Sequence, residues 1–432
     1  MYNIVSKLLI YGNMDEESIL MQLSDIFRCM DEGSQTKDVL RTRVFKQVKR
    51  ILEVATDYAF NKNLWHNYLT YLLITNENPF SITCEKVGAS EGSVNHFAKS
   101  DFKAFKELFD FDFSRIEDEL GVDCFSRISD YQAIGKPELM YNKNVSEKVQ
   151  ALSERLETAK DENEFFDMVT DFYKAYGVGM FGLNKAFRIE ECGDNNIRFR
   201  AINNMDKVVL SDLVGYEIQK QKLVENTEAF VEGRKANNVL LFGDSGTGKS
   251  TSIKAIVNEY YDQGLRMIEI YKHQFKDLSN VIAQIKNRFI IYMDDLSFEE
   301  FEIEYKFLKA VIEGGVETKP ENILIYATSN RRHLIKETWN DRNDVENSNG
   351  MHRSDTMEEK LSLVNRFGVT INYSKPSQKE YFEIVFELAR KAGINMGEDE
   401  LKLEANKWEL SHGGISGRTA QQFINHLMGL QA

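Results

Sequence analysis

Hydrophobic residues recur every three or four positions through roughly the first 180 residues, the spacing that places them on one side of an α-helix. The clearest stripes are Val48, Ile51, Leu52, Ala55 and Tyr58 in one segment and Val149, Leu152 and Leu156 in another. The pattern continues through residues 164–176. Residues 1–180 are therefore predicted to form a mostly α-helical N-terminal domain.

From about residue 205 the pattern changes to short apolar runs that alternate with helical stretches. This alternation predicts a parallel sheet covered by helices on both faces. The predicted strands are Val239–Phe242, Arg266–Ile270, Phe289–Asp294, Ile323–Ser329 and Val369–Tyr373. Residues 205–374 are thus expected to be an α/β domain with a five-stranded parallel sheet between two helical layers.

Two shorter regions flank this α/β domain. Residues 181–204 contain two extended runs around a polar turn, which predicts a β-hairpin junction. The sequence Gly177–Gly182 just before it has the spacing Gly-x-Gly-x-x-Gly, but it follows a predicted helix, whereas the dinucleotide fingerprint follows a strand. After Pro376, a capping box at residues 377–380 opens a helical segment, so residues 375–432 are predicted to be a small helical domain.

The most specific chemical signal is Gly-Asp-Ser-Gly-Thr-Gly-Lys-Ser at residues 243–250, which fits the phosphate-binding P-loop at every defined position. Glycines allow the backbone N–H groups to curl around a phosphate chain. Lys249 is expected to reach the β- and γ-phosphates, and the Ser250 hydroxyl to bind Mg²⁺. The predicted nucleotide contacts are Gly243, Asp244, Ser245, Gly246, Thr247, Gly248, Lys249, Ser250 and Thr251.

Two adjacent acids follow the third predicted strand. Hydrolysis at a P-loop needs one carboxylate near Mg²⁺ and one to orient the attacking water. Asp294 is predicted for the Mg²⁺ role and Asp295 for the water, with Glu299 as an alternative for the second role. Asn330 ends the fourth strand, at the edge where open parallel sheets bind ligands, and is predicted to hold the water or the γ-phosphate.

Together these motifs resemble those of the AAA+ ATPases, and more closely a bacterial AAA+ family of unassigned function. The resemblance covers roughly residues 205–432. Residues 243–250 are similar to Walker A, residues 290–295 to Walker B and residues 327–330 to sensor 1. One departure is the second acid of Walker B, which is Asp295 where most AAA+ hydrolases have glutamate. The departure implies slow hydrolysis or help from Glu299.

The resemblance implies further site residues. Val214, Gly215 and Tyr216 are expected to pack on adenine, and Arg418 is similar to the sensor 2 arginine, which contacts the γ-phosphate from the C-terminal lid. Arg366 is similar to the arginine finger, which acts on the nucleotide of a neighbouring copy. The cofactors implied are ATP and Mg²⁺, and the assembly implied is a homo-oligomeric ring or arc.

Composition narrows the functional classes. The net charge of −14 argues against a general polyanion binder, four scattered cysteines show no zinc spacing, and no apolar run is long enough to span a membrane. We therefore expect a cytoplasmic protein without membrane insertion or a protein-ligated metal centre.

The expected function is ATP-driven remodelling or loading of a macromolecular client. The helical domain is expected to bind this client, and the acidity slightly favours a protein over nucleic acid. The alternatives are a nucleotide-dependent assembly switch with little turnover, and a loader associated with nucleic acid. A small-molecule kinase fits less well, because it would need neither Arg366 nor a lid carrying Arg418.

Overall fold

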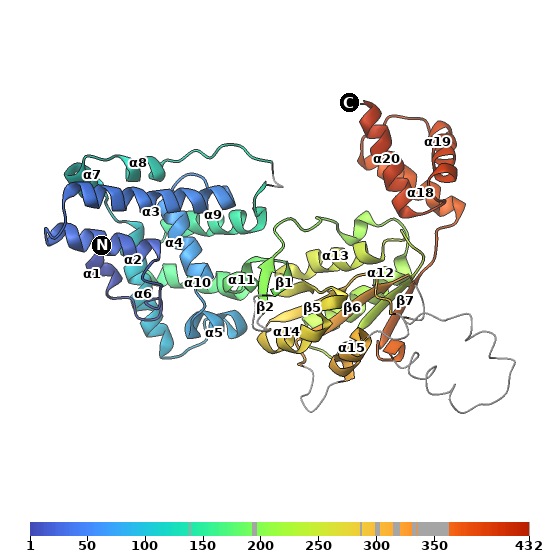
Figure 1. The fold of residues 1–432 in the computed structure, drawn as a ribbon, viewed down its shortest axis with the longest axis horizontal. Helices are drawn as coiled ribbons and strands as arrows, with labels where there is room; N and C mark the ends of the chain where they lie inside the picture. The colour runs from blue at the N-terminus through green and yellow to red at the C-terminus, as the bar shows by residue number, and fades with distance from the viewer. Residues whose placement is uncertain are drawn as a thin grey trace. The chain divides into compact units, whose positions relative to one another are not determined.

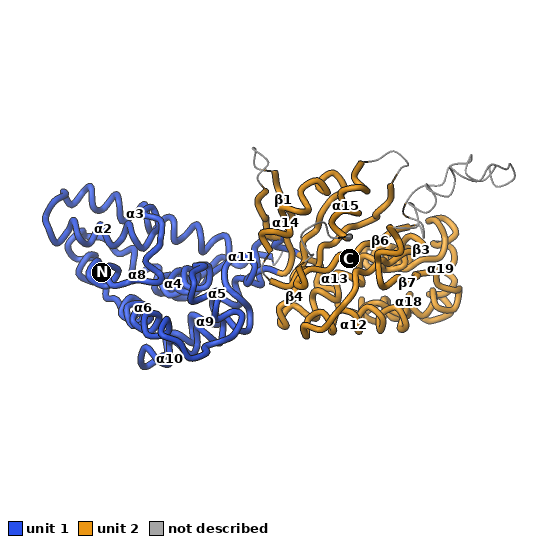
Figure 2. The backbone as a smooth tube through the Cα atoms, turned by 90° about the horizontal axis from the view of Figure 1, so that it is seen from below, with its two compact units in different colours: residues 1–184, 202–204 blue, residues 185–201, 205–432 orange. Residues whose placement is uncertain are grey.

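The computed structural model describes residues 1–137, 140–191, 197–285, 287–298, 303–313, 320–330, 334 and 363–431. The chain divides into two compact units (Figures 1 and 2). The first comprises residues 1–184 and 202–204, and the second comprises residues 185–201 and 205–432. The two predicted hairpin strands therefore belong to the second unit, with the sheet.

The first unit is helical, as the periodicity predicts. Its helices are α1 (Tyr2–Val5), α2 (Ile19–Asp31), α3 (Lys37–Tyr58), α4 (Leu64–Thr75), α5 (Pro79–Val87), α6 (Val94–Phe109), α7 (Ser114–Leu120), α8 (Cys124–Ser129), α9 (Lys143–Glu157), α10 (Glu162–Tyr176) and α11 (Gly179–Leu183). They enclose one hydrophobic core rich in aromatic rings. Among the helices that the structure describes, none is long and apolar enough to cross a membrane.

The N-terminal segment is fastened to this core by a buried carboxylate. Asp101 of α6 is completely buried and accepts hydrogen bonds from the backbone N–H groups of Leu9, Ile10 and Tyr11 at 2.8 to 3.1 Å. The Tyr11 hydroxyl lies 2.7 Å from that of Tyr173 on α10. A buried charge is tolerated only when it is well paired, and here three backbone donors supply that pairing.

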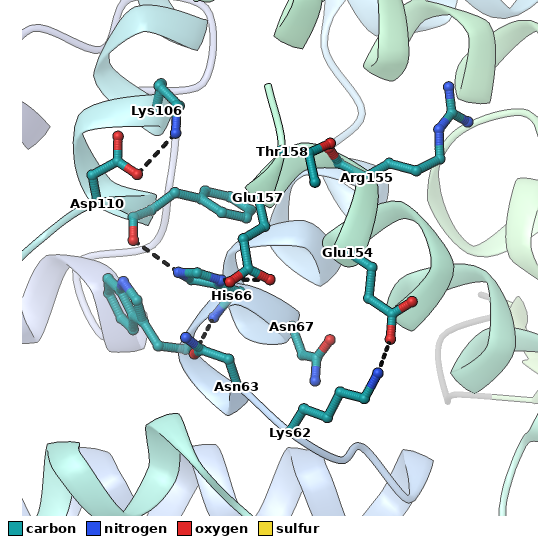
Figure 3. Close-up of polar contacts among 12 residues, drawn as sticks. Lys62, Asn63, His66, Asn67, Lys106, Asp110, Glu154, Arg155, Glu157 and Thr158 are labelled. Atoms are coloured by element: carbon teal, nitrogen blue, oxygen red, sulfur yellow. Dashed lines mark hydrogen bonds and ion pairs between the residues drawn. The ribbon is translucent and has the colours of Figure 1, made fainter. Parts of the chain in front are cut away.

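A second buried polar group, His66 of α4, is only partly paired (Figure 3). Its Nε2–H donates to the carbonyl of Phe109 at 2.8 Å, while Nδ1 lies 3.9 Å from the Glu157 carboxylate and has no hydrogen-bond partner among the described residues. Burial lowers the pKa of His66, although the Phe109 carbonyl and the Glu157 and Asp110 carboxylates oppose the change. The neutral imidazole is thus the form that the folded protein favours.

This lowered pKa predicts an acid sensitivity of the helical unit. Between the folded pKa and the ordinary value near 6.5, the unfolded chain binds a proton that the folded chain does not. The free energy of unfolding should therefore decrease as the pH falls through this range. In His66→Gln, which has no imidazole to protonate, this decrease should be smaller. Urea denaturation at about pH 7.5 and about pH 5.5 measures both proteins. Replacing the exposed His96 with glutamine is the control, and an unchanged pH dependence in His66→Gln would contradict the prediction.

The second unit is built on a seven-stranded sheet in the order β2-β1-β4-β5-β6-β3-β7. Its strands are β1 (Ala186–Glu191), β2 (Ile197–Ala201), β3 (Val239–Gly243), β4 (Leu265–Glu269), β5 (Arg288–Met293), β6 (Ile323–Ser329) and β7 (Val369–Tyr373). The five predicted strands are confirmed, and all their pairings are parallel. The hairpin adds two strands to them, because β1 pairs in parallel with β4 and β2 pairs antiparallel with β1.

Helices cover both faces of the sheet and form the lid. They are α12 (Glu217–Val231), α13 (Lys249–Tyr260), α14 (Leu278–Gln284), α15 (Glu304–Glu313), α18 (Gln378–Lys391), α19 (Glu398–Ser411) and α20 (Gly417–Gln431). Figure 1 shows α12 and α13 on one face and α14 and α15 on the other. The last three helices share a separate core, against which Val214 packs. The predicted α/β P-loop fold with a helical lid is confirmed.

Candidate functional site

The phosphate-binding loop connects β3 to α13. Gly243 has a φ of 128°, and a Cβ there would lie 2.1 Å from the carbonyl oxygen of Tyr373, so a side chain does not fit. Gly248, with a φ of 92°, caps α13 and provides no side-chain acceptor. The first N–H groups of α13 therefore remain for a ligand, and the positive end of the helix dipole favours an anion there.

This loop forms one wall of a pocket of about 680 Å³, a size that suits a small-molecule ligand. The pocket is lined by these predicted site residues: Val214, Tyr216, Ser245, Gly246, Thr247, Gly248, Lys249, Ser250, Thr251, Asp294, Asp295, Asn330 and Arg418. Gly215, Gly243 and Asp244 are not among the lining residues, although Gly215 and Asp244 are adjacent to lining residues along the chain. Residues from the loop, two strand ends and the lid thus meet in one place.

Lys249 lies within the curl of the loop. Its Nζ donates to the carbonyls of Gly243 and Asp244 at 3.0 and 2.6 Å and to Oδ1 of Asn330 at 3.1 Å. Burial lowers the pKa of Lys249, while the carboxylates of Asp295 and Asp244 oppose that change. The ammonium group is therefore placed where phosphate oxygens can replace carbonyl oxygens as its partners.

The two predicted Mg²⁺ ligands are in contact. The Ser250 hydroxyl donates to Oδ1 of Asp294 at 2.7 Å, and the Thr328 hydroxyl donates to the same oxygen at 2.7 Å. Partial burial raises the pKa of Asp294, but these hydrogen bonds outweigh it and leave the pKa below its usual value. An ionised carboxylate beside a hydroxyl is a donor set that suits Mg²⁺, which completes its shell with phosphate and water.

Asp295 points to Asn330 from an uncommon backbone conformation. Asn330 Nδ2 donates to Oδ1 of Asp295 at 2.7 Å, and the Asp295 N–H donates to the Thr328 hydroxyl at 2.9 Å. The φ of Asp295 is 49°, in the left-handed region. Aspartate and asparagine adopt this region more readily than glutamate does, because their short polar side chains can hydrogen-bond locally. This gives a physical reason for aspartate at this Walker B position.

Part of the pocket lining is apolar. Leu213, Val214, Ile384 and Leu388 form this part together with Tyr216, whose ring lies 5.1 Å from that of Tyr373. An apolar slot beside an aromatic ring suits a nucleobase. The predicted adenine contacts Val214 and Tyr216 are thus part of this lining, and their contact with adenine stays a prediction.

The lid contacts the loop directly. The backbone N–H of Arg418, at the start of α20, donates to the carbonyl of Gly246 at 3.2 Å. Lys391 of α18 forms an ion pair of 2.9 Å with Asp212, next to the adenine-side segment. Arg418 thus lies beside the phosphate-binding loop, and its sensor role stays a prediction.

Several predicted residues lie elsewhere. Arg366 is exposed in the turn before β7 and does not line the pocket. Glu299 lies outside the described residues. Thr328 was missed by sequence reasoning, although it lies on β6 only two residues before Asn330, which directly follows the strand.

Residues 183–431 match the protein family described as "Protein of unknown function (DUF815)". The match covers more than half of the chain. The chain belongs to this family. The hairpin, the sheet and the lid of the DUF815 protein all lie within the matched residues.

Three other proteins show partial similarity to this DUF815 chain. The replication factor C large subunit of Methanococcus vannielii is 43% identical over 51 residues, which are 12% of this chain and 10% of that protein. The chain therefore spans about a tenth of the length of this curated relative. The RuvB Holliday junction branch migration motor of Thermotoga maritima is 16% identical, with a TM-score of 0.36 over 53% of this chain and 67% of that one. The FIGL-1 AAA domain in complex with ADP is 19% identical, with a TM-score of 0.36 over 52% of this chain and 74% of that one.

Proposed function

We propose that this protein is an AAA+ ATPase that binds Mg²⁺-ATP in this pocket and hydrolyses it. The observation that carries the proposal is the convergence of Lys249, Ser250, Asp294, Asp295 and Asn330 around the uncapped start of α13. These groups supply a cation for the phosphates, a hydroxyl and a carboxylate for Mg²⁺, and a carboxylate for water. The direct test is Mg²⁺-dependent phosphate release by the purified full chain.

Each residue has a defined task in the proposed mechanism. The N–H groups of α13 and Lys249 bind the phosphates, and Ser250 with Asp294 would hold Mg²⁺, which neutralises charge on the phosphates. Asp295 accepts a hydrogen bond from the attacking water, while Asn330 fixes the carboxylate in place at 2.7 Å. Arg418 approaches from the lid, so closure of the lid adds positive charge and excludes water.

The exposure of Arg366 supports its action on a neighbouring copy. The Arg366→Ala variant retains an intact nucleotide pocket, and the Lys249→Ala variant retains Arg366. Each variant alone should lack ATP turnover. In an equimolar mixture, random head-to-tail assembly should restore roughly a quarter of the parent ATPase rate. The control replaces Lys249→Ala by the double variant, which offers neither group. No recovery in either mixture would overturn the assignment of Arg366 in trans.

We further propose that turnover remodels or loads a macromolecular client bound by the helical unit, with a protein favoured over nucleic acid. The acidity of the chain supports this preference. The alternative is an assembly switch with little turnover, which the short Asp295 side chain and its bond to Asn330 favour. ATP-dependent assembly without measurable phosphate release would support the switch.

A further inference from the structure

One buried polar side chain lies next to the proposed Mg²⁺ ligands without a task in the mechanism. Tyr292 is on β5, two residues before Asp294, which directly follows Met293, the last residue of the strand. The residue is 1% exposed, and its hydroxyl has no hydrogen-bond partner in the part of the chain that the structure describes. A buried hydroxyl without a partner is unfavourable, so such a group in a native protein calls for an explanation.

The surroundings of Tyr292 show which groups its hydroxyl can meet. The Asp294 carboxylate and the Ser250 hydroxyl are among the polar side chains that interact with the Tyr292 hydroxyl, although neither is within hydrogen-bond geometry of it. Ser250 and Asp294 line the pocket whereas Tyr292 does not, so Tyr292 approaches these two residues from the buried side.

We propose that Tyr292 is a positioning residue for Mg²⁺: its hydroxyl donates to the Asp294 carboxylate when the ion engages Asp294 and Ser250. This inference rests on the proposed function of the pocket. Tyr292 itself contacts neither the nucleotide nor the ion.

The hydrogen bonds of Asp294 explain why such a donor matters. Ser250 and Thr328 both donate to the same oxygen, Oδ1. Mg²⁺ requires near-ideal octahedral geometry, and carboxylates near metals are held in orientation by outer hydrogen bonds. Because both existing donors bond to the same oxygen, they leave the carboxylate free to rotate about it. A further donor on the buried side would fix the plane of the carboxylate. The Tyr292 hydroxyl would thereby gain its partner at the step in which the ion binds.

The test removes only this oxygen, with Tyr292→Phe. The affinity of the full chain for a fluorescent ADP analogue is measured over a series of Mg²⁺ concentrations, since ADP excludes interference from turnover. The Mg²⁺ concentration that gives half of the maximal increase in ADP affinity should rise about tenfold in the variant. Tenfold is the lower end of the losses seen when a hydrogen-bond partner of a metal ligand is removed. Affinity without Mg²⁺ should stay unchanged.

Tyr326→Phe is the matched control. Tyr326 pairs with Tyr292 in the neighbouring strand, is equally buried, and is hydrogen-bonded to Thr227 and Asn226. Its substitution should lower the melting temperature without changing the Mg²⁺ dependence. An unchanged Mg²⁺ dependence in folded Tyr292→Phe would overturn the positioning role of Tyr292 but leave the proposed function of the pocket intact. Absence of nucleotide binding, or of any Mg²⁺ effect in the parent protein, would instead overturn the proposed function.

Discussion

Replacing Lys249 with alanine should raise the dissociation constant for ATP by at least about a hundredfold. The ammonium group is the one cation within the curl of the loop in the described part of the pocket, and it already makes three hydrogen bonds there. Charge-assisted hydrogen bonds contribute about 1.5–3 kcal/mol each, and about 1.4 kcal/mol corresponds to a factor of ten. Isothermal titration with ATP and Mg²⁺ measures the loss.

The matched control for this substitution is Lys254→Ala. Lys254 is on the same helix and forms an ion pair of 2.8 Å with Asp206, away from the phosphate-binding loop. Its removal should leave the ATP affinity within about twofold, because an ion pair of this kind contributes little to stability. If Lys249→Ala bound ATP as tightly as Lys254→Ala, the pocket would not be the nucleotide site.

Asp295→Asn should keep ATP binding and lose turnover by a factor of about 10² to 10⁴, the usual contribution of a positioned general base. The substitution suits this position, because asparagine tolerates the left-handed backbone with a φ of 49°. Its amide oxygen can also still accept the hydrogen bond from Asn330. The loss is therefore expected to report on the carboxylate charge rather than on a displaced backbone. Phosphate release and ATP titration on the same preparation separate the two effects.

Normal turnover in Asp295→Asn would contradict the assignment and make Glu299 the candidate, which Glu299→Gln would then test. The inactive protein also serves to find the client. Held in ATP and recovered from its own cells, it should retain a bound protein that a Lys249→Ala control does not. Nuclease-sensitive material in its place would favour the nucleic-acid alternative.

The sequence predicted the strands and the pocket well because both depend on local signals. An apolar run between polar turns marks a strand, and a P-loop has a fixed spacing. The two strands that the hairpin adds to the sheet were only partly predictable. The hairpin itself was recognised from local sequence. Its pairing with β4 through Ala186–Arg188 joins segments about eighty residues apart, and no local pattern encodes such a contact.

Side chains that act through pairing were harder to predict for the same reason. Thr328 and Tyr292 have ordinary strand sequences around them, and Thr328 meets Asp294 only through the register in which β6 pairs with β5. Asp101 is a similar case, since its partners are backbone groups some ninety residues earlier in the chain. The left-handed backbone of Asp295 had no visible sequence signal beyond the residue type itself.

The attachment of the N-terminal segment also sets an order of events during synthesis. Tyr11 is bonded to Tyr173, which is 162 residues later in the chain. At roughly 5–20 residues per second, a ribosome takes about ten to thirty seconds to add the intervening chain. Through that interval the Tyr11 hydroxyl lacks its Tyr173 partner, whereas the backbone N–H groups of Leu9–Tyr11 can pair with Asp101 once α6 has been made. The final docking step of the helical unit must therefore wait until α10 has left the exit tunnel, when the P-loop is about to be translated.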